Sequence, residues 1–231
     1  VGQTTLGFFD QAKHWQYRLG VTQILTPRWL ASANLEAVSD SGYLGNPYRA
    51  ARVFGAAVPE NVPRTRSSRA LNLRAIGDLG SRDAMRVSYR YLGSPSAPRS
   101  AIRGSYRYFW DNWDVKSHTF EGGYSRYVGE SFLLDGFLRH YRQGKASFYS
   151  DDAQVQNTYV TRNRQLGTYN GNTLGGKVTY SWRKVPGQYE IKFNGALELL
   201  RYRYSDYTDL RSGGAYSLNA SVLQLYVTAN Y

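Results

Sequence analysis

The stretch AMRVSYRYL at 84–92 and the stretch AIRGSYRYFW at 101–110 repeat nearly the same phrase. In both, arginine or serine alternates with large apolar or tyrosyl residues. Successive side chains of a β-strand point to opposite faces, so each stretch predicts a strand with one aromatic and one cationic face. Two structures satisfy this pattern: a soluble sheet with its apolar face buried, and a membrane barrel with its apolar face toward lipid.

The same alternation continues through most of the chain, and no helical period competes with it. In HWQYRLGVTQIL at 14–25, for example, Tyr17 and Leu19 oppose Arg18 and Gly20. Although GDLGSRD at 77–83 resembles a turn, a single crossing within 67–92 keeps the long connections on one side. The predicted strands are 14–25, 29–38, one within 67–92, 100–110, 115–127, 132–144, 172–183, 188–203 and 217–231, with GQTTLGFF at the start available as a tenth.

Composition bounds the class of protein. The chain has 231 residues, which predicts one domain over 1–231, and its apolar residues include 21 tyrosines. There is no apolar run of the length that a transmembrane helix needs, so a membrane protein with this sequence would cross with strands. The absence of cysteine excludes disulfides and thiolate sites. The net charge of +12 is spread at strand spacing and not gathered in a run, so we expect no nucleic-acid partner.

Short and long connections alternate along the chain. The short ones lie at 26–28, 93–99, 128–131 and 184–188, and the long polar ones at 39–66, 144–171 and 204–216. Outer-membrane barrels have short periplasmic turns and long extracellular loops. The final strand, SVLQLYVTANY, alternates and ends on Tyr231, which is similar to the insertion signal of bacterial outer-membrane barrels. These features favour a transmembrane antiparallel up-and-down β-barrel.

The number of strands predicts that this chain is part of a larger barrel. Bacterial single-chain barrels have an even number of strands, and an open strand edge in lipid leaves backbone groups unsatisfied. We therefore expect another chain or an upstream segment to complete the barrel. A ladder between the strands at 14–25 and 217–231 would contradict this expectation.

Several phrases resemble a known family, among them YRLGVTQILTPRWLASANLE at 17–36, SGYLGNPYR at 41–49 and SYRYFWDNWDVKSHTFEGGYS at 105–125. They are similar to the C-terminal half of a family of bacterial outer-membrane barrels known only as a domain of unknown function. The resemblance covers most of residues 15–150. It implies the outer membrane of a Gram-negative bacterium, outer-membrane lipid around the protein, and partners among envelope or electron-transfer proteins, with no established activity.

The alternation assigns charged residues to an inner face and apolar residues to a lipid face. The expected inner, lumen-lining residues are Arg18, Glu36, Arg86, Arg90, Arg103, Arg107, Glu121, Asp135, Arg139, Lys177, Glu190 and Lys192. The expected lipid-facing residues are Tyr17, Leu19, Val21, Tyr106, Tyr108, Tyr180, Ile191, Phe193 and Val227.

The arginines at 86, 90, 103 and 107 have two interpretations. As a cationic ladder they would form an anion-selective wall. In a packed lumen they would pair with Glu36, Glu121, Asp135 or Glu190 and hold the shape of the barrel. The mixed signs of charge favour the packed lumen.

The long loops are the expected protease-sensitive and partner-binding surface, because binding residues concentrate on loops carried by a rigid scaffold. Their best candidates for contacts are aromatic and basic: Tyr43, Tyr48, Arg49, Arg162 and Tyr169.

No catalytic or metal site is predicted. His14, His118 and His140 fall in different strands, and no G-x-S-x-G or phosphate-binding motif occurs. Asp151, Asp152 and Asn157 could hold calcium in a long loop. The alternative is a solvated acidic loop, which we favour.

We therefore expect a non-enzymatic channel, conduit or scaffold in a larger envelope assembly, without a cofactor. The alternatives are an outer-membrane barrel enzyme that hydrolyses lipid or peptide, and a soluble β-barrel that binds a ligand.

Overall fold

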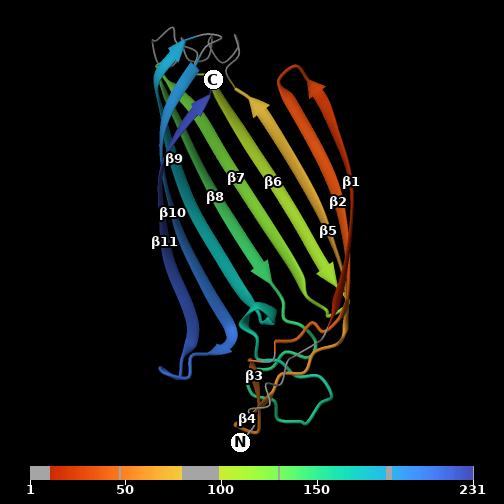
Figure 1. Cartoon of the computed structure of the whole chain (residues 1–231). Coiled ribbons are helices and arrows are strands. Elements are labelled where there is room, and N and C mark those ends of the chain that lie inside the picture. Colours follow the sequence, from red (N-terminus) through yellow and green to blue (C-terminus); the bar gives the residue numbers. More distant parts are fainter. Residues whose placement is uncertain (1–10, 47, 80–98, 130, 186–188, 231) are drawn as a thin grey trace, which may run out of the picture.

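A single large antiparallel sheet dominates the chain. The computed structural model describes residues 11–46, 48–79, 99–129, 131–185 and 189–230. Figure 1 shows the sheet curved into an open trough, with its strands inclined to the long axis. Its strands are β1 (Ala12–Thr26), β2 (Trp29–Gly42), β5 (Thr65–Asp78), β6 (Ser100–Asp111), β7 (Lys116–Val128), β8 (Phe132–Gln143), β9 (Tyr169–Val185), β10 (Tyr189–Thr208) and β11 (Ala215–Asn230).

The prediction of an all-β chain is confirmed. The main sheet has nine strands in the order β1-β2-β5-β6-β7-β8-β9-β10-β11, so each strand pairs with its neighbour in the chain apart from a short hairpin. That hairpin, β3 (Ala50–Val53) with β4 (Ala56–Pro59), is an addition to the predicted strands. The phrase at 101–110 forms β6, whereas the phrase at 84–92, with Arg86 and Arg90, lies outside the described residues.

The sheet is open along both edges within the described part of the chain. There, β1 pairs with β2 and β11 pairs with β10, and the two edge strands form no ladder with each other. The structure therefore shows a nine-stranded antiparallel sheet, and the closed barrel stays a prediction.

Register divides the strand residues between two faces. Residues opposite one another in an antiparallel pair point to the same face. Arg18 is opposite Glu36, and Asp135 is opposite both Ser125 and Lys177, so these residues share the polar face. The intervening positions form an apolar face. The sequence alternation therefore places charged and apolar side chains on opposite sides of one sheet.

The polar face lies on the inside of the curve. Its side chains reach one another across an intervening strand, as Arg103 of β6 does when it bonds Asp135 of β8. Inward curvature also crowds these positions, so that Thr173 and Asn194 are buried in a single-layered sheet.

The apolar face lies on the outside of the curve and is exposed in the isolated chain. Leu19 is 75% exposed, Leu138 60% and Leu225 76%. The described strands thus carry large aliphatic side chains that no second layer of the protein covers.

The long connections gather at one end of the sheet, which we call the loop end, and the turn between β1 and β2 lies at the opposite turn end (Figure 1). At the loop end, the described residues of 43–64 pack with 112–115 and 144–168 into a folded cap. A buried apolar cluster joins these segments, and it consists of Val62, Trp113, Val115, Ala146, Tyr149 and Leu166. A smaller cluster of Ala51, Ala153 and Val160 fixes the β3–β4 hairpin to the same cap.

Helical structure among the described residues includes a short 3-10 turn, Arg164–Leu166, within the cap. No helix in the described residues is long and apolar enough to cross a membrane.

Candidate functional site

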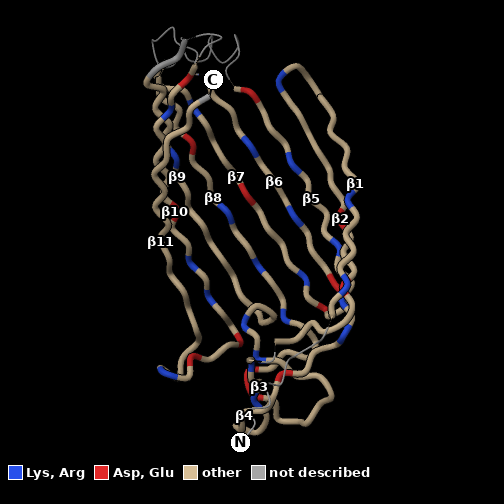
Figure 2. The backbone as a smooth tube through the Cα atoms, viewed as in Figure 1, with Lys and Arg blue, Asp and Glu red and all other residues tan. Residues whose placement is uncertain are grey.

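Two features of the molecule are candidates for a functional site. One is the charged inner face of the sheet, and the other is the cap that packs against the loop end of that sheet. Figure 2 shows basic and acidic residues distributed along most of the strands, while β11 carries no charged residue. The inner face can act on an ion or a polar partner only through groups that its internal ion pairs leave available.

Arg103 is the centre of the first group of ion pairs. Its guanidinium donates in bidentate fashion to Asp135, with both nitrogen–oxygen distances 2.8 Å. Its Nε lies 3.9 Å from Glu121, which in turn accepts a 2.7 Å bond from Arg139. Ser125 donates its hydroxyl to Asp135. This group links β6, β7 and β8 across the inner face, and bidentate arginine–carboxylate pairs are among the stronger polar contacts in proteins.

A second group lies between β1, β2 and β6. Glu36 accepts bonds from Arg18 at 3.1 and 3.2 Å, and Arg107 approaches it from β6 at 3.7 Å. On β10, Lys192 lies 2.7 Å from Glu190. Each of the carboxylates of Glu36, Glu121, Asp135 and Glu190 is thus held by at least one cation.

These contacts agree with the packed interpretation of the charged residues. Arg103 and Arg107 pair with Asp135, Glu121 and Glu36, as that interpretation expects. Lys177 lies over the ring of Tyr226 at 5.3 Å. The assignment of these residues to the lining of a lumen stays a prediction.

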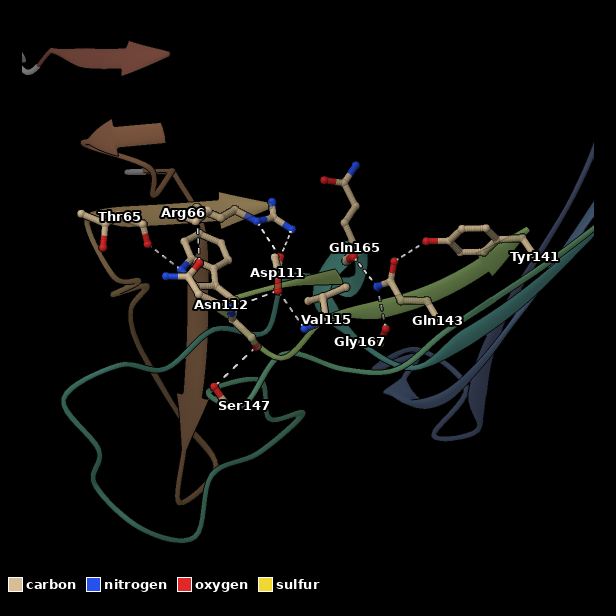
Figure 3. A network of polar contacts seen from close by, with 12 residues as sticks. Thr65, Arg66, Asp111, Asn112, Val115, Tyr141, Gln143, Ser147, Gln165 and Gly167 are labelled. Atoms are coloured by element: carbon tan, nitrogen blue, oxygen red, sulfur yellow. Dashed lines mark hydrogen bonds and ion pairs between the residues drawn. The ribbon is translucent and has the colours of Figure 1, made fainter. Parts of the chain in front are cut away.

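The cap is fastened to β6 by Asp111, whose side chain has no exposed surface. One carboxylate oxygen accepts the backbone N–H groups of Trp113 and Val115 at 3.0 and 2.9 Å (Figure 3). The other accepts a 2.8 Å bond from Nε of Arg66 in β5. The Arg66 guanidinium also lies 4.6 Å from the ring of Trp113, a cation–π contact. One carboxylate therefore ties two strands to the turn that starts the cap.

Gln143 fastens the long segment 144–168 at the end of β8. Its side-chain amide donates to the carbonyls of Gln165 and Gly167 at 2.8 and 3.0 Å (Figure 3). Farther along, the hydroxyl of Tyr149 donates to the carbonyl of Asp206 in β10 at 2.9 Å. Burial raises the pKa of the Tyr149 phenol far above its usual range. The phenol is therefore a neutral donor at physiological pH.

The structure divides the loop residues that the sequence predicts as contacts. Tyr48 is 95% exposed and Arg49 is exposed, so both are free to meet a partner. The side chain of Arg162 is only 9% exposed, because it donates to Asp151 and to the carbonyl of Thr208.

Tyr169 packs between Tyr141 and Tyr204, with ring centroids 5.2 and 4.9 Å away, and Tyr43 is half-buried. Arg162 is thus held within the cap and Tyr169 is packed between neighbouring strands, and a role of either residue in partner contacts stays a prediction.

The histidines are held by separate partners. His14 lies 2.6 Å from Asp40, His118 bonds the hydroxyl of Tyr106, and His140 bonds Asn172, the last two at 2.8 Å.

Both acidic residues of the suggested calcium loop already have partners. Asp151 holds Arg162, and Asp152 accepts the backbone N–H of Gly55 at 2.9 Å. In the residues that the structure describes, no group of three or more histidine or acidic side chains is arranged to hold a metal ion.

Sequence reasoning missed Asp111 and Gln143, the residues that fasten the cap. The available signal is the DNWD turn at 111–114, where a carboxylate precedes a large aromatic residue at the end of an alternating strand. The contacts of Asp111 with Arg66, and of Gln143 with Gln165 and Gly167, join separate segments, so sequence spacing does not reveal them.

The chain belongs to the family described as "Protein of unknown function (DUF3570)". The family model matches residues 3–93 and 96–217, a wider extent than the phrases that suggested a resemblance. No curated protein matches the chain in a sequence comparison.

Proposed function

We propose that this protein is a β-barrel of the Gram-negative outer membrane that acts as a capped scaffold in a larger envelope assembly. The observation that carries the proposal is the outer face of the sheet, which is apolar, exposed and bordered by aromatic rings. Tyr108 and Trp110 stack at the loop end, and Phe132 stacks on Tyr180 at the turn end.

The aromatic borders are spaced as a bilayer requires. Tyr108 is in register with Arg142 of β8 through His118, and Arg142 lies ten residues after Phe132. At 3.4 Å per residue along the strand, 4.8 Å per strand across the sheet and a tilt of about 40°, the two borders are about 20 Å apart along the membrane normal, close to the apolar band of outer-membrane barrels. Leucine, valine, alanine and glycine occupy most of the outward positions between them.

A soluble protein would have to cover this surface. Contiguous exposed apolar patches on soluble monomers rarely exceed a few hundred Å². Here the exposed leucines extend from Leu19 on one edge strand to Leu225 on the other. Lipid is the environment that makes such a face stable without further protein.

The open edges support closure by further strands. In lipid, each unsatisfied backbone group at the edges of β1 and β11 costs several kcal/mol. We therefore propose that another chain or an upstream segment pairs with these edges and completes the barrel.

The inner face and the cap favour a scaffold over an open pore. Arg18, Arg103 and Arg139 are all engaged by carboxylates, which leaves no continuous cationic wall among the described residues. The cap packs against inner-face residues such as Phe109 and Gln143 at the loop end. A folded segment at this position restricts passage through the barrel.

Fractionation and reconstitution test the proposal together. The protein should sediment with the outer membrane, resist extraction by carbonate and float with phospholipid vesicles. In planar bilayers the complete barrel, with the strands that close it, should give no stable conductance until the cap is loosened by Asp111→Ala. Recovery in the soluble fraction would contradict the membrane location, and steady conductance of the native protein would contradict the capped scaffold.

A further inference from the structure

The charged side chains that remain on the apolar face are cations, and nearly all lie toward its loop end. Those at the loop end are Lys13, Arg69, Lys116, Arg142, Arg201 and Arg203, all of them exposed. Arg126 is the cation that this face carries at the turn end, among side chains that the structure describes. We call the loop-end group the basic rim.

Carboxylates follow the opposite rule. Every carboxylate within the paired registers of the main sheet points to the inner face, and these residues are Glu36, Asp40, Asp78, Asp111, Glu121, Asp135, Glu190 and Glu198. The rim cations consequently have no ion pair within the described chain, whereas inner-face arginines such as Arg103 are paired. Unpaired cations beside an apolar surface are available to an anion from outside the protein.

Register assembles part of the rim into adjacent rows of hydrogen-bond donors. Arg142 of β8 is opposite Asn170 of β9, which is opposite Arg203 of β10. The two arginines are therefore two strands apart, or about 10 Å. The next row toward the turn end places His140, Asn172 and Arg201 side by side.

The tilt of the strands brings the rim to a common depth. A row of residues paired in register runs perpendicular to the strands. Because the strands are tilted, such a row lies closer to the loop end at β11 than at β1 (Figure 1). For a tilt of about 40° and standard strand spacing, the rim cations fall within a belt about 10 Å deep. That depth matches the headgroup region of one leaflet.

An apolar groove of about 660 Å³ begins next to these rows. Leu138 and Leu174 line it directly beneath His140 and Asn172, and Gly122 contributes to its wall without a side chain. A Cβ added at Gly122 would meet nothing within 4 Å, so the groove is open on the outer face.

We propose that the basic rim and this groove bind a phosphorylated lipid of the leaflet at the loop end, with phosphate on the arginines and an acyl chain in the groove. The proposal rests on the membrane location proposed above. Charge complementarity selects the occupant, because cations near the apolar boundary of a bilayer attract anionic headgroups. The same asymmetry fixes the loop end toward the leaflet that is richer in phosphate.

The test uses the full chain reconstituted into phosphatidylcholine vesicles doped with fluorescently labelled lipid A, a lipid that carries phosphate monoesters. Energy transfer from the tryptophans of the protein to the label reports binding. The rim variant is Arg142→Gln with Arg201→Gln and Arg203→Gln. The matched control, Arg49→Gln with Lys145→Gln and Arg211→Gln, removes the same charge from exposed loop positions. Gly122→Leu fills the groove without changing any charge.

The rim variant should bind lipid A about 100-fold more weakly than the native chain, and the control should stay within about threefold. Gly122→Leu should also weaken binding, and dephosphorylated lipid A should bind as poorly to the native chain as lipid A does to the rim variant. Equal losses in the rim variant and the control, or full displacement by inorganic phosphate, would overturn the proposal. Flotation of each variant is measured separately, because failure to float contradicts the membrane location and not the lipid site.

Discussion

Replacing Leu225 by arginine should destabilise the protein only when it is in a bilayer. The side chain of Leu225 is 76% exposed in the isolated chain, so the substitution removes little packing within the protein. In water we expect a change within about 0.5 kcal/mol, which is usual for surface positions. In a bilayer, an arginine near the middle of the lipid face costs about 2 to 4 kcal/mol.

The neighbouring residue provides the control. Gln224 precedes Leu225 on the same strand and points to the inner face, so Gln224→Arg adds the same charge at the same depth. The free energy of unfolding is measured by urea titration in phospholipid vesicles for the native chain and both variants. We expect Leu225→Arg to be at least about 2 kcal/mol less stable than Gln224→Arg. Equal stabilities of the two variants, or a lower stability of Gln224→Arg, would refute the assignment of the lipid face.

Three further outcomes follow from the inner face and the cap. Arg103→Met should lower the free energy of unfolding by about 2 kcal/mol. This loss is smaller than for a fully buried pair because Arg103 and Asp135 are each about a quarter exposed. Urea titration of Arg103→Met, Asp135→Asn and the double variant should give losses that are less than additive. Limited trypsin digestion followed by mass spectrometry should cut after the exposed Arg49 before it cuts after Arg162, and the reverse order would contradict the folded cap. Asp111→Ala should lower the free energy of unfolding by about 3 kcal/mol or more and let trypsin cleave rapidly after Arg162. Unchanged cleavage after Arg162 would show that Asp111 does not fasten the cap.

The strands and their faces follow from local sequence. Alternation with a period of two is a property of each strand, and a register error of one residue would exchange every side chain between the faces. Tyr17 and Leu19 on one side and Arg18 on the other could therefore be placed from the pattern alone. The prediction of one crossing within 67–92 came from the alternation of short and long connections, since two crossings would have moved a long loop to the opposite end.

The cap and the ion pairs depend on contacts that sequence spacing does not encode. Gly55 bonds Asp152, and Asn61 bonds the carbonyl of Thr158, each pair separated by 97 positions in the chain. The burial of Arg162 is also not encoded locally, because its partners, Asp151 and Thr208, approach it only when the loops fold together. Likewise, the mixed charges predicted pairing in general, whereas the choice of Asp135 for Arg103 depends on the curvature of the sheet across β7.

The most direct test of the membrane face uses nitroxide spin labels at Leu19 and at Arg107 of the protein in phospholipid vesicles. Leu19 is in register with Tyr108 through Leu35 and Leu71, and Arg107 is the residue next to Tyr108, on the opposite face of the sheet. Relaxation by oxygen reports lipid, and relaxation by a water-soluble nickel complex reports water. The label at Leu19 should respond to oxygen and the label at Arg107 to nickel, while water exposure of both labels, or the reverse pattern, would contradict a lipid-facing outer surface.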